Sequence, residues 1–384
     1  MKISKVICDM VHVPFNSPVL WGSGRRPGAT RLILQIETDV GITGLGETIC
    51  LWDFVEPVLK KTLIPMLLGE DPHNIERITR KAEGLGLYHH KRALVAALCG
   101  IEIALWDIIG KEANLPLFQL LGGRYREKVM MSGLLHIRTP EEMAKQATDF
   151  VARGFKTIKA KAGLDPQLDI EIVKAIRKRI PAEINLRVDV NGGWTIGTAK
   201  RQIQMLKAYD LEYIEQPLIL EDLAGHANLS GLGLVPIALD ESVYTIQDTL
   251  NILRSGAADV FLIDHHESGG IWSAKKAAAI AEAAGIPCSM HGAGELGIST
   301  AARLHIAAST PNISLAVDSE YHNMLDDIIT KPFKYENGSI APPEGPGLGV
   351  ELDPLKLQKY RIHQIIGAYG DPEKPDWFTV KPTY

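Results

Sequence analysis

Polar residues recur at a nearly constant spacing along the second half of the chain, and this repeat restricts its fold more than any other feature. Each polar residue ends a short apolar segment such as TIKAK, and amphipathic helical patterns lie between the segments. These residues are Lys161, Asp189, Glu215, Asp240, Asp264, His291 and Asp318. A spacing of about 25 residues is the length of one strand and one helix. With an earlier strand near 129–132, the repeat predicts an α/β fold with a (β/α)8 barrel over residues 126–345.

The polar strand ends predict a metal site. The C-terminal ends of barrel strands converge on one face, so their side chains should share one pocket. Asp189, Glu215 and Asp240 end three consecutive strands, and carboxylates this close repel one another unless a cation neutralises them. Oxygen ligands favour Mg2+, with Mn2+ as an alternative, over zinc. One such acid is commonly a cap or an ion-pair partner, but three in phase indicate a metal site.

Two lysines and one histidine are the candidate proton-transfer groups. Lys159 and Lys161 are two residues apart in a strand, so both side chains should point into the barrel, the alternative being a solvated outer face. Their mutual repulsion and a nearby cation should lower their pKa values. Asp264 and His291 end adjacent strands, which predicts a carboxylate–imidazole dyad; the alternative for His291 is a hydrogen-bonded core residue. We expect the lysines and His291 on opposite sides of a substrate carboxylate.

Residues 1–125 have a different pattern and predict an α+β capping domain. Segments 2–13 and 31–38 are rich in β-branched and aliphatic residues, and residues 93–111 have helical periodicity. Residues 14–30 contain several glycines and prolines, so we predict a loop there. Carrying Trp21 and Arg25, this loop would be a lid that contacts the substrate, the alternative being a solvated connection.

Composition restricts the partners. The formal net charge is −5 with no basic stripe, which argues against nucleic acid and anionic membranes. Because no signal-peptide pattern or run of about 18 apolar residues is present, we expect a cytoplasmic protein that acts on a small molecule. The four cysteines lack CxxC spacing and are interpreted as buried thiols rather than a zinc site; they are Cys8, Cys50, Cys99 and Cys288.

An ordered set of motifs resembles the mandelate racemase and muconate lactonizing branch of the enolase superfamily. In the barrel these are KAK at 159–161, DVNGGW from Asp189, IEQP around Glu215, LDES around Asp240 and SGG at 268–270. The N-terminal part carries GLGET at 44–48 and IALWDIIGK at 103–111, and PGLGVELD lies at 346–353. The resemblance implies a capped barrel, a C-terminal segment 346–384 that packs on the capping domain, and a homo-oligomer, from dimer to octamer.

The resemblance also implies roles for individual residues. Lys161 would be the base on one side of the substrate, with Lys159 as its electrostatic neighbour, and His291 the acid or base on the other side. Asp264 stands where the muconate lactonizing enzymes carry a lysine, so the Asp264–His291 pair is similar to that of mandelate racemase and the acid-sugar dehydratases. Asp240 is favoured over Glu241 as the third metal ligand. Asn191 would lie beside the metal, and Asp318 would bind the enediolate or a hydroxyl.

These assignments lead to several candidate functions. The first is Mg2+-dependent dehydration of an acid sugar, an aldarate or aldonate, to a 2-keto-3-deoxy acid, with the lid arginines holding a distal carboxylate. The second is racemisation or epimerisation, for which Trp21 and Trp52 would suit a less polar substrate. Cycloisomerisation is disfavoured because the lysine is missing, and a non-catalytic binding barrel because every candidate metal ligand and base is present.

Overall fold

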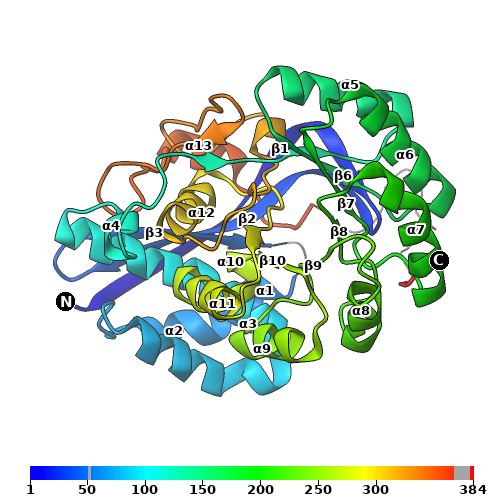
Figure 1. Ribbon diagram of the computed structural model, residues 1–384. Coiled ribbons are helices and arrows are strands. Elements are labelled where there is room, and N and C mark those ends of the chain that lie inside the picture. Colours follow the sequence, from blue (N-terminus) through cyan, green and yellow to red (C-terminus); the bar gives the residue numbers. More distant parts are fainter. Residues whose placement is uncertain (51–52, 367–380) are drawn as a thin grey trace.

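The N-terminal part of the chain is a three-stranded antiparallel sheet covered by helices. A computed structural model (Figure 1) describes residues 1–50, 53–366 and 381–384, with only the backbone described for residues 86–90. The strands β1 (Ile3–Trp21), β2 (Gly24–Thr38) and β3 (Thr43–Ile49) lie in the order β1-β2-β3. Four helical segments pack on this sheet and share an apolar core with it: α1 (Val55–Val58), the π-helical η1 (Leu59–Leu63), α2 (Ile64–Leu67) and α3 (Ile75–Ala113).

Residues 14–30 form the end of a β-hairpin, and the prediction of a loop there was wrong. β1 continues to Trp21 and β2 begins at Gly24, with a shift of the strand register between Pro14 and Val19. The shift accommodates the proline, which cannot donate to a strand partner. The hairpin is ordered because apolar side chains, Val19 and Trp21 among them, are buried in the same cluster as the barrel core. Glycine and proline content therefore misled the interpretation of this segment.

Helix α3 packs very closely on β3. The backbone of Gly46 comes so near to the carbonyl oxygen of Gly100 that a Cβ atom on Gly46 would overlap it, which explains the glycine in GLGET. Residues Lys91–Ala113 of α3 are long and apolar enough to cross a membrane, but 83% of that stretch is buried inside the protein. The apolar side chains of α3 are therefore used by the fold itself.

The larger part of the chain is a parallel barrel, as predicted. Seven strands lie in the order β11-β10-β9-β8-β7-β6-β5. Residues 315–318 close the barrel, because the Val317 N–H donates to Met130 and the Asp318 N–H donates to Met290. The strands are β5 (Gly133–Leu135), β6 (Thr157–Lys161), β7 (Asn185–Asp189), β8 (Tyr213–Glu215), β9 (Ile237–Leu239), β10 (Val260–Ile263) and β11 (Cys288–Met290).

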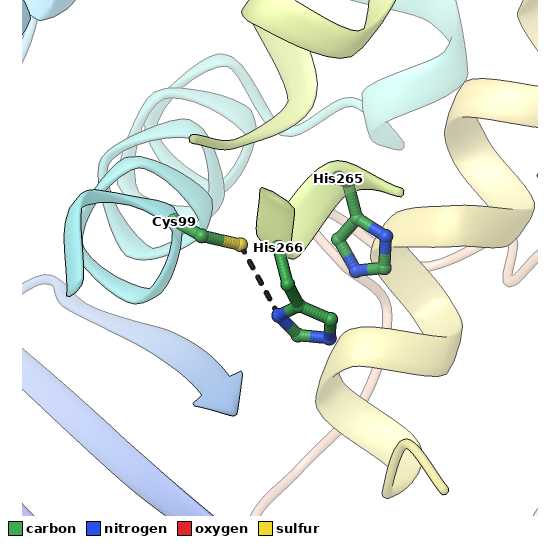
Figure 2. A group of neighbouring side chains, drawn as sticks. All are labelled: Cys99, His265 and His266. Atoms are coloured by element: carbon green, nitrogen blue, oxygen red, sulfur yellow. Dashed lines mark hydrogen bonds between the residues drawn. The ribbon is translucent and has the colours of Figure 1, made fainter. Parts of the chain in front are cut away.

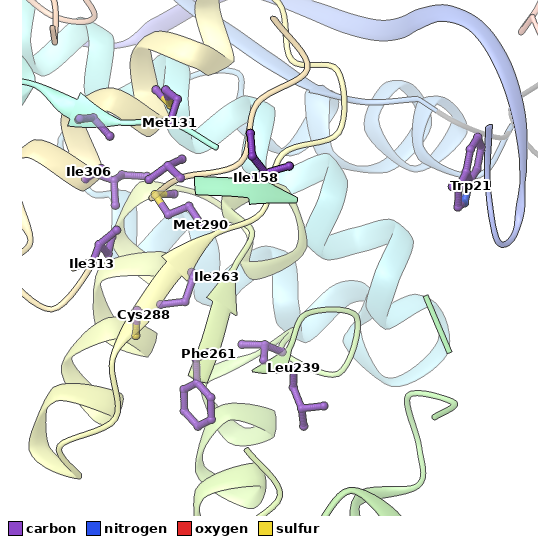
Figure 3. Packing of buried hydrophobic residues seen from close by; sticks show 14 of the residues in the cluster. Trp21, Met131, Ile158, Leu239, Phe261, Ile263, Cys288, Met290, Ile306 and Ile313 are labelled. Atoms are coloured by element: carbon purple, nitrogen blue, oxygen red, sulfur yellow. The ribbon is translucent and has the colours of Figure 1, made fainter. Parts of the chain in front are cut away.

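Helices connect the strands and cover the outside of the barrel. They are α5 (Pro140–Ala152), α6 (Pro166–Arg179), α7 (Ile196–Leu206), the 3-10 helix η2 (Lys207–Tyr209), α8 (Leu223–Ser230), α9 (Ile246–Ser255), α10 (His265–Ser268), α11 (Ile271–Ala283) and α12 (Gly297–Ser309). Alternate strand residues such as Phe261, Ile263, Cys288 and Met290 pack in the core together with Ile306 of α12 (Figure 3). In the same view Trp21 stands apart at the end of β1.

The capping part is joined to the barrel by buried carboxylates. Helices α11 and α12 have no side-chain cap of their own, whereas α5 to α10 each begin at a Thr or Asp whose side chain accepts a backbone N–H. Glu102 of α3 accepts the N–H groups of Ile271 and Trp272 at 2.7 and 2.9 Å. Glu47 of β3 accepts those of Leu296 and Ser299, each at 2.8 Å. The capping part thus supplies the N-caps of two barrel helices.

The C-terminal segment returns to both parts of the molecule. In the chain, α4 (Leu117–Leu120) and β4 (Val129–Met130) precede the barrel, and η3 (Tyr321–Asn323) and β12 (Ser339–Ile340) follow it; β4 and β12 form an antiparallel pair. After α13 (Pro354–Tyr360), Arg361 pairs with Asp9 of β1 at 3.0 Å. Residues 381–384 lie beside the loop after β7, where the N–H of Thr383 donates to the carbonyl of Gly193 at 2.9 Å. The rest of the predicted segment, residues 367–380, and Trp52 lie outside the described residues.

We expect Gly46→Ala to lower the free energy of unfolding by about 1–3 kcal/mol, because the new methyl group overlaps the α3 backbone. Gly84→Ala is the matched control. Gly84 is an exposed residue of the same helix with open space around it, so alanine should stabilise the protein by about 0.5–1 kcal/mol. Urea unfolding of the two variants measures both effects. Equal effects of the two substitutions would contradict the close approach of β3 and α3.

Candidate active site

The polar residues of the repeat stand at the C-terminal ends of their strands. Lys161, Asp189 and Glu215 are the last residues of β6, β7 and β8, and they lie side by side in register. Asp240, Asp264 and His291 directly follow β9, β10 and β11. Asp318 belongs to the closing segment. The sequence repeat and the barrel geometry therefore coincide at this edge.

Lys159 lies beneath this row, inside the barrel. Its side-chain nitrogen is 2.6 Å from Glu215, 2.5 Å from Asp318 and 3.1 Å from Asp189. Burial disfavours the charged lysine, but the three carboxylates outweigh it and raise the pKa of Lys159 well above its ordinary value. The prediction that a neighbouring lysine lowers this pKa is wrong for Lys159, because the three carboxylates raise the pKa instead. Lys159 is placed to hold the acidic side chains rather than to exchange protons.

Lys161 faces the open side of the same row. Its nitrogen donates to Asp189 at 2.7 Å and to the Asn191 side-chain oxygen at 3.1 Å. Burial lowers its pKa, yet the Asp189 carboxylate raises it above the ordinary value. The Asn191 amide in turn donates to Glu241 at 2.9 Å. Asn191 thus connects the candidate base to the opposite wall of the site.

The acidic side chains fit a divalent cation. The Oε2 atom of Glu215 and the Oδ1 atom of Asp240 are buried and have no hydrogen-bond partner among the described residues. Ligand atoms of Glu215, Asp240 and His291 lie within 4.8 Å of one another. Burial and the neighbouring carboxylates raise the pKa values of Glu215 and Asp240 well above their ordinary range. A cation bound to these oxygens would relieve both the repulsion and the lack of partners.

Asp189 and Glu241 bear on this ligand set in different ways. Burial raises the pKa of Asp189, but the ammonium groups of Lys159 and Lys161 outweigh it and lower that pKa, so its carboxylate is charged. Glu241 points towards Asn191, whereas Asp240 faces Glu215 and His291. The geometry therefore favours Asp240 over its neighbour as the third ligand.

The predicted hydrogen bond between Asp264 and His291 does not occur in the structure. Nδ1 of His291 lies 2.8 Å from Oδ2 of Asp240, an ion-pair distance without hydrogen-bond alignment. The Asp264 carboxylate instead accepts the backbone N–H of His266 at 2.7 Å, because Asp264 is the N-cap of α10. The single-turn helix after β10, which periodicity could not reveal, turned this carboxylate towards the backbone. Asp264 and His291 nevertheless line the same cavity.

The cavity above the strand ends has a volume of about 110 Å3. Trp21 contributes to its wall, but Arg26 lines it in place of the predicted Arg25. Arg26 pairs with Glu320 at 2.8 Å, and its guanidinium lies 5.5 Å from the Trp21 ring centre. The other lining side chains with polar groups are Ser23, Lys161, Asn191, Asp240, Glu241, Asp264, Glu267, His291 and Glu320. Neither Lys159 nor Asp318 reaches this wall.

Asp318 is buried below the cavity rather than in contact with it. It is fully buried and accepts hydrogen bonds from Ser132 at 2.7 Å and Lys159 at 2.5 Å. Arg187 of β7 is 3.5 Å from the same carboxylate. Its place favours positioning of Lys159 over the predicted contact with the substrate.

Sequence reasoning missed two other groups near the cavity. Glu267 belongs to the single turn α10, which lies outside the repeat. Lys381 comes from the last four residues, and its Nζ atom is buried without a hydrogen-bond partner in the described parts of the chain. Burial lowers the pKa of Lys381 to about 8, although Glu241 and Asp189 oppose this shift. The SGG motif at 268–270 could have drawn attention to the neighbouring Glu267 but not to Lys381.

A second cluster of side chains lies between α3 and α10 (Figure 2). The Cys99 sulfur is 3.4 Å from Nδ1 of His266, and Ser299 links Nε2 of His266 at 2.8 Å to Nε2 of His265 at 2.6 Å. Burial lowers the pKa of His265 to about 3, so that ring is neutral. The four side chains therefore bind one another at the junction of cap and barrel, while the buried Nδ1 atom of His265 has no hydrogen-bond partner among the described residues. All four cysteines are free thiols, and all but Cys8 are buried, in agreement with the prediction.

The capped barrel carries a lysine, a histidine and four carboxylates at its strand ends, a set that fits a metal-dependent enzyme, and sequence comparison identifies the family. Residues 4–122 match the mandelate racemase / muconate lactonizing enzyme N-terminal domain, and residues 142–356 match the family described as enolase C-terminal domain-like. The chain belongs to the mandelate racemase and muconate lactonizing enzyme family of the enolase superfamily.

Its relatives catalyse more than one reaction. The chain is 31% identical to an N-succinyl-L-Arg/Lys racemase from Bacillus cereus over 95% of this chain and 100% of the relative, and the racemase structure matches with a TM-score of 0.89. It is 30% identical to a probable glucarate dehydratase from Streptomyces coelicolor over 89% of this chain and 87% of that one. An enolase from Pseudomonas fluorescens, solved with magnesium, potassium and tartrate, matches with a TM-score of 0.87 at 28% identity, over 100% and 99% of the two chains.

Magnesium should stabilise the protein through Asp240. After treatment with EDTA, adding MgCl2 should raise the unfolding temperature of the wild type by roughly 2–4 °C, because the cation binds only the folded acidic site. Asp240→Asn should abolish most of this shift, whereas the neighbouring Glu241→Gln should retain it. Differential scanning fluorimetry measures all three proteins. Loss of the shift in Glu241→Gln and its retention in Asp240→Asn would assign the third ligand to Glu241.

Proposed function

We propose that this protein dehydrates an acid sugar to a 2-keto-3-deoxy acid, with Mg2+ held by Asp189, Glu215 and Asp240. The observation that carries the proposal is the presence of Lys161 and His291 on one cavity, with the carboxylate row of β7 to β9 between their strands. Relatives with bound magnesium and a relative named as a probable glucarate dehydratase support it. Mn2+ has no such support.

The first step is removal of the proton next to the substrate carboxylate. Lys161 is the acceptor, because its nitrogen lines the cavity beside Asn191 and Asp189. A cation held by Asp189, Glu215 and Asp240 would supply positive charge where negative charge develops on the substrate carboxylate, and it would compete with Lys161 for Asp189. Lys159, fixed by Glu215 and Asp318, keeps the acidic side chains in place during this step. Asn191 orients the Lys161 nitrogen.

The second step expels the β-hydroxyl group. The electron pair left at the α-carbon forms a carbon–carbon double bond as the β carbon–oxygen bond breaks. His291, protonated, donates its proton to the departing oxygen, so that water leaves and an enol remains. The enol ketonises to the 2-keto acid. After these steps Lys161 carries one extra proton and His291 lacks one. Proton exchange with solvent returns both side chains to their starting state.

Racemisation or epimerisation is the second candidate. It needs the same pair of groups, with His291 returning a proton to the α-carbon from the other side and no bond to oxygen broken. The similarity to the Bacillus cereus racemase favours it, as does Trp21 on the cavity wall. The homo-oligomeric state and the cytoplasmic location stay predictions.

Proton exchange and keto-acid formation separate these functions. In D2O with Mg2+ and a panel of aldonates, aldarates and hydroxy acids, a dehydratase should form a product that reacts with a carbonyl reagent. A racemase should exchange the α-proton without such a product. Lys161→Met and His291→Asn should each lower turnover about 100- to 10,000-fold because each removes a proton-transfer group.

The control is Lys174→Met, since Lys174 is an exposed lysine of α6. It should leave turnover unchanged. Turnover in Lys161→Met equal to that of the wild type would show that the proposed base is wrong. Exchange without any carbonyl product would replace the dehydratase by the racemase.

A further inference from the structure

Glu267 presents an unused hydrogen-bond acceptor to the cavity. It lies on α10, the single turn between Asp264 and the glycines Gly269 and Gly270, both of which have positive φ angles. The turn therefore holds its position by its backbone rather than by the Glu267 side chain. Glu267 lines the cavity, and its Oε2 atom is buried with no hydrogen-bond partner in the described parts of the protein.

A buried carboxylate oxygen without a donor is costly. Leaving such a group unpaired is unfavourable because the lost hydration is not compensated by a hydrogen bond. Burial, Asp240 and Asp264 raise the pKa of Glu267 well above its ordinary value, and the charge of His291 opposes this shift only in part. Native proteins retain such groups where a ligand completes them.

The cations on the cavity wall do not complete Glu267. Lys161 donates to Asp189 and Asn191, Arg26 pairs with Glu320, and Nδ1 of His291 lies 2.8 Å from Asp240. The Tyr244 hydroxyl hydrogen-bonds to the Glu267 carboxylate, but the Oε2 atom of Glu267 still lacks a donor among the described residues, which leaves the ligand to supply one. A ligand carboxylate at this place would meet Glu267, Asp264 and Glu241 on the same wall and be repelled. A hydroxyl or an ammonium group would be attracted.

We propose that Glu267 is a specificity-determining residue that accepts a hydrogen bond from a donor group of the substrate beyond its reacting carbons. This inference rests on the proposed function and narrows it: the preferred acid sugar is an aldonate, with a polyhydroxy chain and one carboxylate, rather than an aldarate. It also reverses the expectation that lid arginines hold a distal carboxylate, because Arg26 is neutralised by Glu320.

Substrate pairs that differ only in the distal donor test the proposal. The first pair is an aldonate and glycerate. Glycerate keeps the α-proton and the β-hydroxyl of the aldonate but lacks every hydroxyl beyond them. The second pair is an N-acyl-lysine and an N-acyl-norleucine, of which only the first has a terminal ammonium group. Exchange of the α-proton measures the reaction of both. The first pair applies if the protein is a dehydratase, and the second if it is a racemase.

The variants are Glu267→Leu, Glu267→Gln and, as a control, Glu282→Leu, an exposed glutamate of α11. Glu267→Leu should lower kcat/KM for the donor-bearing substrate about 10- to 100-fold, and for its partner without the donor less than about 3-fold. Glu267→Gln keeps an acceptor oxygen, so the loss should be smaller with an aldonate. With the ammonium substrate, the loss of kcat/KM in Glu267→Gln should equal the loss in Glu267→Leu, because neither variant has a carboxylate charge at this position. The control should change neither.

The outcomes separate the two proposals. Wild-type keto-acid formation, or its absence, decides the proposed dehydration. The role of Glu267 is decided by the ratio of the kcat/KM values for the two substrates of a pair, and by how each variant changes that ratio. The pair used is the one on which the wild type acts. An equal loss with both members of the pair, or faster turnover of an aldarate than of an aldonate, would overturn that role. Turnover or exchange of neither pair by the wild type would overturn both. Thermal unfolding identifies a misfolded leucine variant, in which case Glu267→Gln decides.

Discussion

The structure depends on the docking of two cap carboxylates onto barrel helices. Glu102 and Glu47 bind the N-termini of α11 and α12, which have no side-chain caps of their own. Burial raises the pKa of both glutamates to about 7, although the N–H donors oppose this, so the contacts are costly to leave incomplete. Gly270 must lack a side chain because a Cβ atom there would overlap Glu102. The motifs GLGET and SGG, together with Glu102 directly before IALWDIIGK, are thus connected by one interface.

This interface also determines the mouth of the active site. The loop that carries His291 leads directly into α12, and Arg31 of β2 donates to the carbonyl oxygens of Ala293 and Gly294 in that loop at 2.6 and 2.9 Å. The hairpin of β1 and β2 reaches over the strand ends, where Gly22 approaches the carbonyl oxygens of Ala162 and Val190. The cap therefore positions the loop of His291 and covers the cavity on the side of Lys161.

The barrel interior is held together by charge rather than by apolar packing alone. Lys159 and Arg187 are fully buried among Asp189, Glu215 and Asp318, and Arg187 stacks on Tyr213 with its guanidinium 4.7 Å from the ring centre. Removing one member of such a group leaves a buried charge unpaired, at a cost of about 3–5 kcal/mol. This charged floor keeps the carboxylates of the candidate metal site within reach of one another, which an apolar core could not do.

The sequence by itself determined the barrel, the cap and the chemistry at the strand ends. Lys161, Asp189, Glu215, Asp240 and His291 could be found because a strand-and-helix repeat forces the residue after each apolar segment onto one face. Contacts between segments far apart in the chain could not be found in this way. Only the tertiary structure made residues 14–30 a hairpin, since their order comes from burial against the barrel. It also turned Asp264 onto its helix, gave Arg26 rather than Arg25 the cavity wall, and left the Oε2 atom of Glu267 without a hydrogen-bond partner among the described residues. These features follow from side-chain direction and packing, which spacing along a sequence does not specify.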